Sequence, residues 1–171
     1  MTPEFSRPEQ IETIGDEPRT IAIAADADER RRLAGRFGLI AIESLTASLT
    51  IRRDAATVRA EGRVAAKVVQ ACSVTGDPLP TTVDEPVALR FVPPAGSEEE
   101  IELAADALDT VEIENGAIDL GEAAAETMAL ALAPFPRGPR AAEALRAAGV
   151  TDALPAGAFG ALAALRDRLK E

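Results

Sequence analysis

Alternation of apolar and polar residues constrains the fold of this chain more than any other feature. Across residues 45–52, the odd positions from Leu45 to Ile51 are apolar and the even positions are polar. From Thr57 towards Thr75 the even positions, such as Val58 and Val64, are the apolar ones. A period of two is typical of a strand with one buried face and one face in water. Both stretches are therefore predicted to be strands, the first beginning near residue 40.

These two strands are predicted to form a hairpin. A four-residue turn at residues 53–56 would pair Arg52 with Thr57 and Thr50 with Arg59. Even positions then meet odd positions, so the two apolar faces coincide and the two polar faces coincide, which supports this register. Gly62 is interpreted as a bulge or bend in the second strand.

A third strand is predicted after the turn-forming residues 75–80. It places Val87, Leu89 and Phe91 on one face, and Pro86 puts it at a sheet edge because proline cannot donate to a ladder. The predicted fold class is α+β, an antiparallel β-meander of at least three strands (about 40–52, 57–75 and 82–92) with helices packed on its apolar face. The side chains expected to be buried are Leu45, Leu49, Ile51, Val58, Val64, Val68, Leu89 and Phe91, and those expected to be exposed are Arg59, Arg63 and Lys67.

Two carboxylates mark helix starts. Asp26, followed by Glu29 three residues later, predicts a capped helix that runs to about Phe37 and ends at Gly38. Asp119 predicts the start of a second helix, which is apolar nearly all round over residues 123–133 and is therefore expected to be buried on most sides. Shorter elements are predicted as strands at Ile11–Ile14, Thr20–Ala24 and Thr110–Ile113, and as helices at Ala141–Ala148 and along a C-terminal stripe through Phe159, Leu162, Leu165 and Leu169.

Missing residue types exclude several chemistries. The chain has no His, which removes the usual general base and the commonest metal ligand, and one Cys, which excludes an internal disulfide and closed Cys/His zinc sites. Cys72 is interpreted as a small core residue on a strand face with valines, with no neighbouring His or Lys to lower its pKa. No catalytic, cofactor-binding or metal-ligating residue is predicted. No run of apolar residues is long enough to span a membrane, and a cytoplasmic protein is expected.

The excess of negative charge comes from one segment. The net charge is −11, and residues 97–126 hold eleven acidic residues and no basic one. This segment could bind a partner or a divalent cation, but a solvated loop is favoured. Residues 1–171 are expected to form a single domain, with an acidic, mobile loop at 94–109 and a helical segment at 140–171.

Cations gather on the polar side of the second strand. Arg59, Arg63 and Lys67 alternate there, with Arg52 nearby on the first strand. Such a row could contact phosphates, although protection of the strand edge and solubility are the favoured interpretation. The segment 134–140, which reads PFPRGPR, has polyproline character and could dock onto a partner or pack back on the sheet.

Two stretches resemble one known family. Residues 68–79 (VVQACSVTGDPL) with 86–91 (PVALRF) resemble the central hairpin of the YceD family, the large ribosomal RNA subunit accumulation proteins. Residues 119–126 (DLGEAAAE), leading into 129–137 (ALALAPFPR), are similar to its second signature. The opening residues 5–8 (FSRP) and the helix end at 33–39 (LAGRFGL) are similar to its alphaproteobacterial branch.

The chain departs from the family at one point. Many relatives carry Cys-x-x-Cys at the hairpin, whereas this chain has Cys72-Ser-Val-Thr75. A metal or redox role for that pair therefore cannot apply, and the resemblance implies a structural hairpin. It also implies a role in the accumulation of large-subunit ribosomal RNA, with no catalytic residues to carry over.

Three functions remain open from the sequence. The first is a non-catalytic ribosome biogenesis factor, whose direct partner is ribosomal RNA or a ribosome assembly protein, with no role for DNA or membrane. The others are a small protein-binding adaptor without a ribosomal role and an enzyme that uses the acidic segment with a divalent cation. Contact with RNA or a partner, if direct, is expected at Arg52, Arg59, Arg63 and Lys67.

Overall fold

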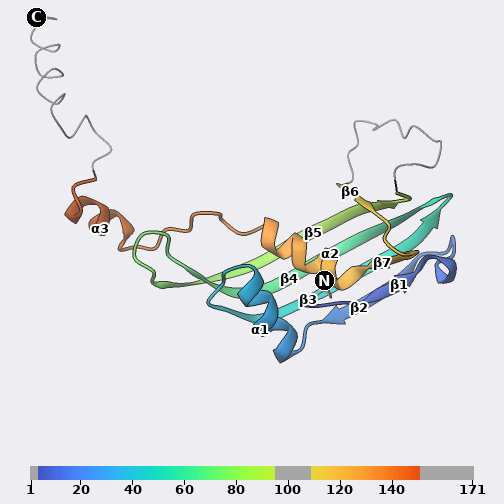
Figure 1. Cartoon of the computed structure of the whole chain (residues 1–171), viewed down its shortest axis with the longest axis horizontal. Coiled ribbons are helices and arrows are strands. Elements are labelled where there is room, and N and C mark those ends of the chain that lie inside the picture. The colour runs from blue at the N-terminus through green and yellow to red at the C-terminus, as the bar shows by residue number, and fades with distance from the viewer. Residues whose placement is uncertain (1–3, 95–108, 151–171) are drawn as a thin grey trace, which may run out of the picture. The chain divides into compact units, whose positions relative to one another are not determined.

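A computed structural model describes residues 4–94 and 109–150 (Figure 1). Five strands form the main sheet in the order β2-β3-β4-β5-β6, and β1 pairs with β7 in a separate ribbon. The main-sheet strands are β2 (Arg19–Ala24), β3 (Ala41–Asp54), β4 (Thr57–Ala71), β5 (Pro78–Val92) and β6 (Asp109–Glu112). The remaining elements are β1 (Pro8–Gln10), the 3₁₀ turn η1 (Ile11–Thr13), α1 (Ala27–Arg36), β7 (Ala117–Asp119), α2 (Leu120–Leu130) and α3 (Ala141–Ala147).

The described residues divide into two compact units. The first, here called the sheet unit, comprises residues 4–70, 80–94 and 109–134. The second, here called the turn unit, comprises residues 71–79 and 135–150, and so holds the connection from β4 to β5 together with α3. The single domain, the mobile loop at 94–109 and the helical segment at 140–171 stay predictions, since residues 95–108 and 151–171 lie outside the described part of the chain.

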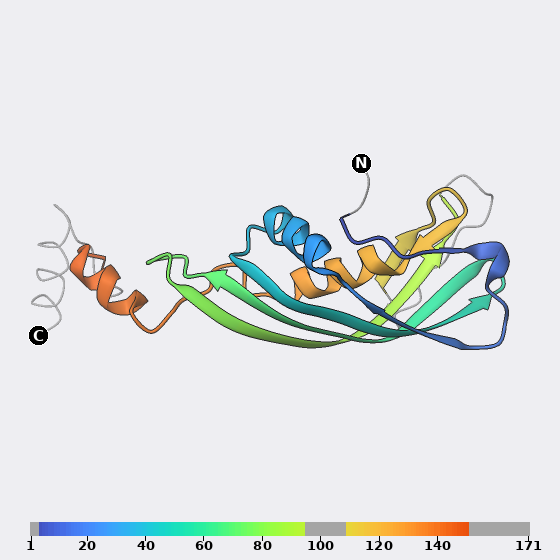
Figure 2. The same cartoon turned by 90° about the horizontal axis from the view of Figure 1, so that it is seen from below.

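The α+β fold with an antiparallel meander is confirmed. β2, β3 and β4 pair antiparallel, and β6 runs parallel to its neighbour, β5. Figure 2 shows α1 and α2 lying together on one face of the sheet. All eight side chains expected in the core are buried: Leu45, Leu49, Ile51, Val58, Val64, Val68, Leu89 and Phe91.

The register of the β3–β4 hairpin differs by two residues from the expected one. The turn contains only Ala55 and Ala56, so that Asp54 pairs with Thr57 and Arg52 pairs with Arg59. A shift of two leaves every side chain on its expected face, so the alternation could not distinguish the two registers. The shorter turn holds Ala55 at a φ of 55°, a conformation in which an alanine is strained.

The sequence suggested a bulge or bend at Gly62, but the bulge lies in β3. The pairing shifts between Ile42 and Ser44, which makes Glu43 the extra residue and lets both Ile42 and Leu45 face the core. Gly62 keeps regular register opposite Leu49. Its role is close approach, because a Cβ there would lie 2.0 Å from the backbone oxygen of Ser48.

The main helices begin where their caps predicted. Asp26 and Glu29 complete the capping box of α1, and Gly38 follows α1 with a φ of 64°. Asp119 caps α2 by accepting the N–H groups of Gly121 and Glu122. The burial expected for this helix holds over its first turns but is wrong at its end, where Leu130 is 84% exposed.

Three boundaries also need correction, and the first is the start of β5 at Pro78, where residues 75–80 were expected to form a turn and the strand to begin near residue 82. The strand expected at Ile11–Ile14 is the 3₁₀ turn η1, preceded by the three-residue strand β1. β4 ends at Ala71 rather than at Thr75, so Cys72 lies in the following turn and not on a strand face. Pro86 does lie at an open edge, because β6 pairs with β5 only from Leu89 onward among the described strands.

Candidate functional site

The four cations singled out in the sequence lie on one face of the β3–β4 ladder. Arg52 and Arg59 are direct cross-strand partners, Arg63 is opposite Ser48 and Lys67 is opposite Ser44. On β4 they alternate with buried residues of the core, so they point away from the face that α1 and α2 cover. We call this set of four, Arg52, Arg59, Arg63 and Lys67, the open-face cations. The eight residue steps from Arg59 to Lys67 span about 26 Å along the strand.

Two of these cations are already paired. The Arg59 guanidinium lies 3.1 Å from the Asp54 carboxylate, and its side chain is only 28% exposed, which corrects the expectation that it is exposed. Arg63 donates from Nε to Oδ1 of Asp84 at 2.9 Å, with both side chains well exposed. Exposed ion pairs contribute roughly 0–1 kcal/mol, so Arg63 can exchange Asp84 for another anion at little cost.

Arg52 and Lys67 are exposed, and neither forms an ion pair with any residue that the structure describes. Hydroxyl groups lie beside them on the same face, including Ser48 and the pair Thr20–Thr50, whose oxygens are 2.8 Å apart. Hydroxyls and cations together are the usual donors to phosphate oxygens. The face can therefore bind anions, with Glu61 as the one acidic residue between Arg59 and Arg63 on β4.

The sequence reading missed one further cation. Arg90 lies on β5 between the buried Leu89 and Phe91, so it points to the same side of the sheet as the open-face cations. Its Nε–H is buried and has no hydrogen-bond partner in the described part of the chain, whereas the Nε of Arg59, which also makes no hydrogen bond of good geometry, lies 3.1 Å from the Asp54 carboxylate. The alternation around Arg90 was visible in the sequence, but the strand's place beside β4 came from the fold.

A cavity of the opposite charge lies elsewhere in the sheet unit. It has a volume of about 590 Å³ and an apolar floor that includes Phe91 and Ile118. Arg36 is its one lining cation, and that guanidinium is bound to Glu122 at 2.6 Å and to Glu4 at 3.0 Å. The carboxylates that line this cavity are Glu4, Glu112, Glu114, Asp119, Glu122 and Glu126. A phosphate is repelled there, whereas a cationic side chain is not.

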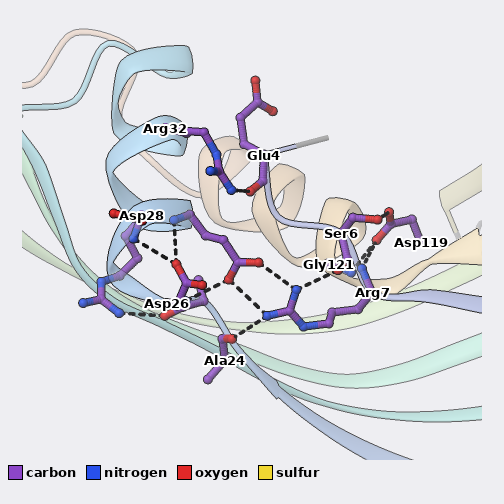
Figure 3. Close-up of polar contacts among 12 residues, drawn as sticks. Glu4, Ser6, Arg7, Ala24, Asp26, Asp28, Arg32, Asp119 and Gly121 are labelled. Carbon is purple, nitrogen blue, oxygen red and sulfur yellow. Dashed lines mark hydrogen bonds and ion pairs between the residues drawn. The ribbon is translucent and has the colours of Figure 1, made fainter. Parts of the chain in front are cut away.

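Figure 3 shows the polar network that holds the N-terminal segment beside both helices. Arg7 binds the Glu29 carboxylate through two contacts of 2.8 and 3.0 Å, and it also donates to the carbonyl of Ala24 at 3.1 Å. This guanidinium lowers the pKa of Glu29. Asp119 accepts from the Ser6 hydroxyl at 2.5 Å and from the Arg7 backbone N–H at 2.8 Å. Each of these groups is used to anchor the segment, which makes the network structural.

Cys72 is buried, as expected, but its surroundings differ from a valine-lined strand. Its Sγ accepts the backbone N–H of Gly138 at 3.3 Å and that of Thr75 at 3.5 Å. These donors, chiefly Gly138, lower the pKa of the thiol to about 6. No His or Lys takes part, as the sequence indicated; the donors are backbone groups that come together only in the fold.

Asp77 links the two segments of the turn unit. Its carboxylate accepts the Thr75 hydroxyl at 2.6 Å and binds the Arg140 guanidinium, whose Nε lies 3.1 Å away. These two groups, Thr75 first, lower the pKa of Asp77. Ser73 adds two bonds to the carbonyl of Pro136, from its backbone N–H at 2.8 Å and from its hydroxyl at 3.0 Å.

The described residues show neither of two other kinds of site. No helix among them is long and apolar enough to cross a membrane. Across residues 4–94 and 109–150, no three Asp, Glu or Cys side chains gather in a way that could hold a metal ion.

Comparison with known proteins gives one match. A family model described as Large ribosomal RNA subunit accumulation protein YceD matches residues 60–154, which is more than half of the chain. The matched range contains Arg63, Lys67 and every described residue of the turn unit. No curated protein and no solved structure matches the chain.

Proposed function

Because the chain belongs to the YceD family of large ribosomal RNA subunit accumulation proteins, we propose that it supports the accumulation of large-subunit ribosomal RNA. The observation that carries this proposal is the family match over residues 60–154. In this proposal the protein is a non-catalytic factor, as the family description suggests, and the absence of His together with the burial of the one thiol excludes His-based and thiol-based catalysis. We propose a cytoplasmic location, where it would meet ribosomal RNA or a ribosome assembly protein.

The open-face cations are the proposed contact. Arg52 and Arg59 stand directly opposite each other, and like charges in that position destabilise a ladder. Asp54 already offsets part of this repulsion by pairing with Arg59, and a phosphate bound between the two arginines would offset the rest, which supports binding of a polyanion. The net charge of −11 opposes the approach of naked RNA, so binding by the protein alone is expected to be weak and to be strengthened by a protein partner.

Salt dependence distinguishes how many of these cations take part. Each phosphate neutralised on a single strand contributes about 0.7 to the slope of log K against log salt. Arg52 and Lys67 alone therefore predict a slope of about −1.4, and all four cations predict about −2.8. The steeper value would mean that Arg59 and Arg63 leave Asp54 and Asp84 on binding.

Deletion and complementation test the proposal. Loss of the protein should lower mature large-subunit ribosomal RNA, and the wild-type chain should restore it. The double variant Arg63→Glu with Lys67→Glu should restore it poorly and cofractionate less with large-subunit precursors. Arg31→Glu is the matched control, because Arg31 is also an exposed arginine paired with one aspartate, Asp28 at 2.7 Å.

Equal complementation by the double variant and by the control would exclude the open face as the contact. Unchanged ribosomal RNA after deletion would contradict the function itself. The acidic cavity supports the alternative, a protein-binding adaptor, because basic side chains fit it. In that case the protein would bind a basic partner while ribosomal RNA stays at its normal level.

A further inference from the structure

Phe135 is an aromatic side chain left in water. It is 77% exposed, whereas Phe5 and Phe91 are buried in the sheet unit and Phe37 packs partly against its core. Phe135 lies between Pro134 and Pro136, outside any helix or strand. Burial of an aromatic ring is favourable wherever the chain can reach a core, so the exposed Phe135 ring is free to contact a ligand.

The backbone around Phe135 is held in place, so the ring is not on a loose loop. The carbonyl of Pro136 accepts two hydrogen bonds from Ser73, and the N–H of Gly138 donates to Cys72. Arg140 closes the segment through its ion pair with Asp77. The proline rings on both sides of Phe135 restrict φ further. The segment is therefore preorganised with its aromatic side chain outward, which lowers the entropy cost of binding.

The charge near Phe135 favours an anionic ligand. Arg137, two residues along, is exposed and has no hydrogen bond or ion pair to any residue that the structure describes. The described residues of the turn unit hold three arginines (Arg137, Arg140 and Arg146) against two acidic residues (Asp77 and Glu143). This small excess of positive charge contrasts with the net charge of −11 for the whole chain.

An exposed ring two residues from a free guanidinium matches the way proteins bind single-stranded nucleic acid, in which a base stacks on the ring and a cation holds the backbone. A protein-docking patch would require a broader apolar surface. Within the described turn unit, the other large apolar side chain that is exposed is Val150, at 53%. A single ring suits a single base.

We propose that Phe135 is a stacking platform for a base of single-stranded RNA and that Arg137 binds an adjacent phosphate. The choice of RNA rests on the proposed function. The site itself is separate from the open-face cations and lies in the other unit of the chain.

Binding of a fluorescently labelled oligouridylate to the full-length protein, measured by anisotropy at low salt, tests this site. Phe135→Ala should weaken binding about 5- to 100-fold, the range typical of one stacked base. Phe135→Trp should preserve it, because indole also stacks. Leu130→Ala is the matched control: Leu130 is an equally exposed apolar side chain, 84% exposed at the end of α2, and its removal should change nothing.

Two further readouts separate stacking from general charge. A duplex RNA of the same length should bind Phe135→Ala and wild type equally, because paired bases cannot reach the ring. Arg137→Gln should make the salt slope shallower by about 0.7, as expected for one lost phosphate contact. Both variants should keep the wild-type melting temperature, since neither side chain makes a contact that holds the fold.

Equal oligouridylate affinity of Phe135→Ala and Leu130→Ala would overturn the proposal. So would a Phe135→Ala variant that binds RNA normally but no longer cofractionates with ribosomal precursors, since the ring would then contact a protein. Failure of the proposed function looks different, because deletion would leave ribosomal RNA unchanged whatever the anisotropy shows. Loss of oligouridylate binding in that case would still support the stacking platform.

Discussion

Strand β4 lies between two turns, and each turn reverses the chain with a residue in the left-handed conformation. The turn before it has only two residues and places Ala55 at a φ of 55°. The turn after it uses Gly76 at a φ of 73° and closes with internal bonds, such as Cys72 N–H to the Asp77 carbonyl at 2.8 Å. The first turn is short and strained, whereas the second is longer, well bonded and built around groups that also hold residues 135–140.

This difference indicates what each turn is for. The first turn only reverses the chain, and the strain at Ala55 is tolerated because the long ladder between β3 and β4 enforces the pairing. The second turn has a regular left-handed glycine and a set of polar contacts from Ser73, Thr75 and Asp77. Those contacts fix a segment that carries the exposed Phe135, so local order there serves presentation of a side chain.

The largest expected effect comes from breaking the ladder between the two turns. Gly62→Ala would put a Cβ 2.0 Å from the Ser48 backbone oxygen, so the two strands must move apart. We expect a loss of roughly 3 kcal/mol or more in the free energy of unfolding, as for other overpacked sites. Chemical denaturation measures it.

Gly35→Ala is the matched control for that substitution. Gly35 lies in α1, and nothing lies within 4 Å of the Cβ that alanine would add. Alanine is favoured over glycine inside a helix by about 1 kcal/mol, so this variant should be more stable than wild type. A Gly62→Ala protein as stable as wild type would show that the strands are not in close contact at this position.

Replacing alanine by glycine in the first turn, and glycine by alanine in the second, should change the free energy of unfolding by about 1 kcal/mol with opposite signs. Ala55→Gly removes left-handed strain and should stabilise the protein, whereas Gly76→Ala introduces such strain and should destabilise it. No atom crowds the new Cβ at Gly76, so backbone conformation is the only cause there. Denaturation midpoints of the two variants measure the difference, and equal signs would contradict the contrast between the turns.

The smallest effect is a pH dependence that belongs to the second turn alone. The Cys72 thiol has a pKa of about 6 in the fold, below its ordinary value of 9.0, because backbone N–H groups stabilise the thiolate. The unfolded chain thus binds more protons between these values, so stability rises as pH increases from about 6 to 9 and is lost as pH falls through 6. The two N–H···S contacts, at 3.3 and 3.5 Å, have ordinary lengths for a sulfur acceptor, and at neutral pH only the lower part of the range from 6 to 9 has been crossed, so the gain in melting temperature there is modest.

Ultraviolet titration of thiolate absorbance checks this prediction directly, since Cys72 is the only cysteine. Cys72→Ser should remove the added pH dependence of the melting temperature, because a hydroxyl does not ionise in this range. A thiol that titrates near 9 in the folded protein, as it should in urea, would show that Gly138 and Thr75 do not bind it.

Several features of the fold followed from the sequence. Alternation placed Leu49, Val58 and Val64 in the core because side chains of a strand point to opposite faces with a period of two. Asp26 and Asp119 marked helix starts correctly because a cap acts on N–H groups only two or three residues away. The same alternation placed Arg59, Arg63 and Lys67 together on the opposite face of β4.

The tertiary structure decided the features that depend on distant segments. A register shift of two residues leaves every side chain on the same face of the sheet, so the alternation cannot reveal it. Only the assembled ladder shows that Arg52 lies opposite Arg59. Asp84, which pairs with Arg63, comes from another strand, and Gly138, which lowers the pKa of Cys72, lies 66 residues along the chain. Local patterns determined which way each side chain points, whereas the partners that set its charge and exposure were brought to it by long-range packing.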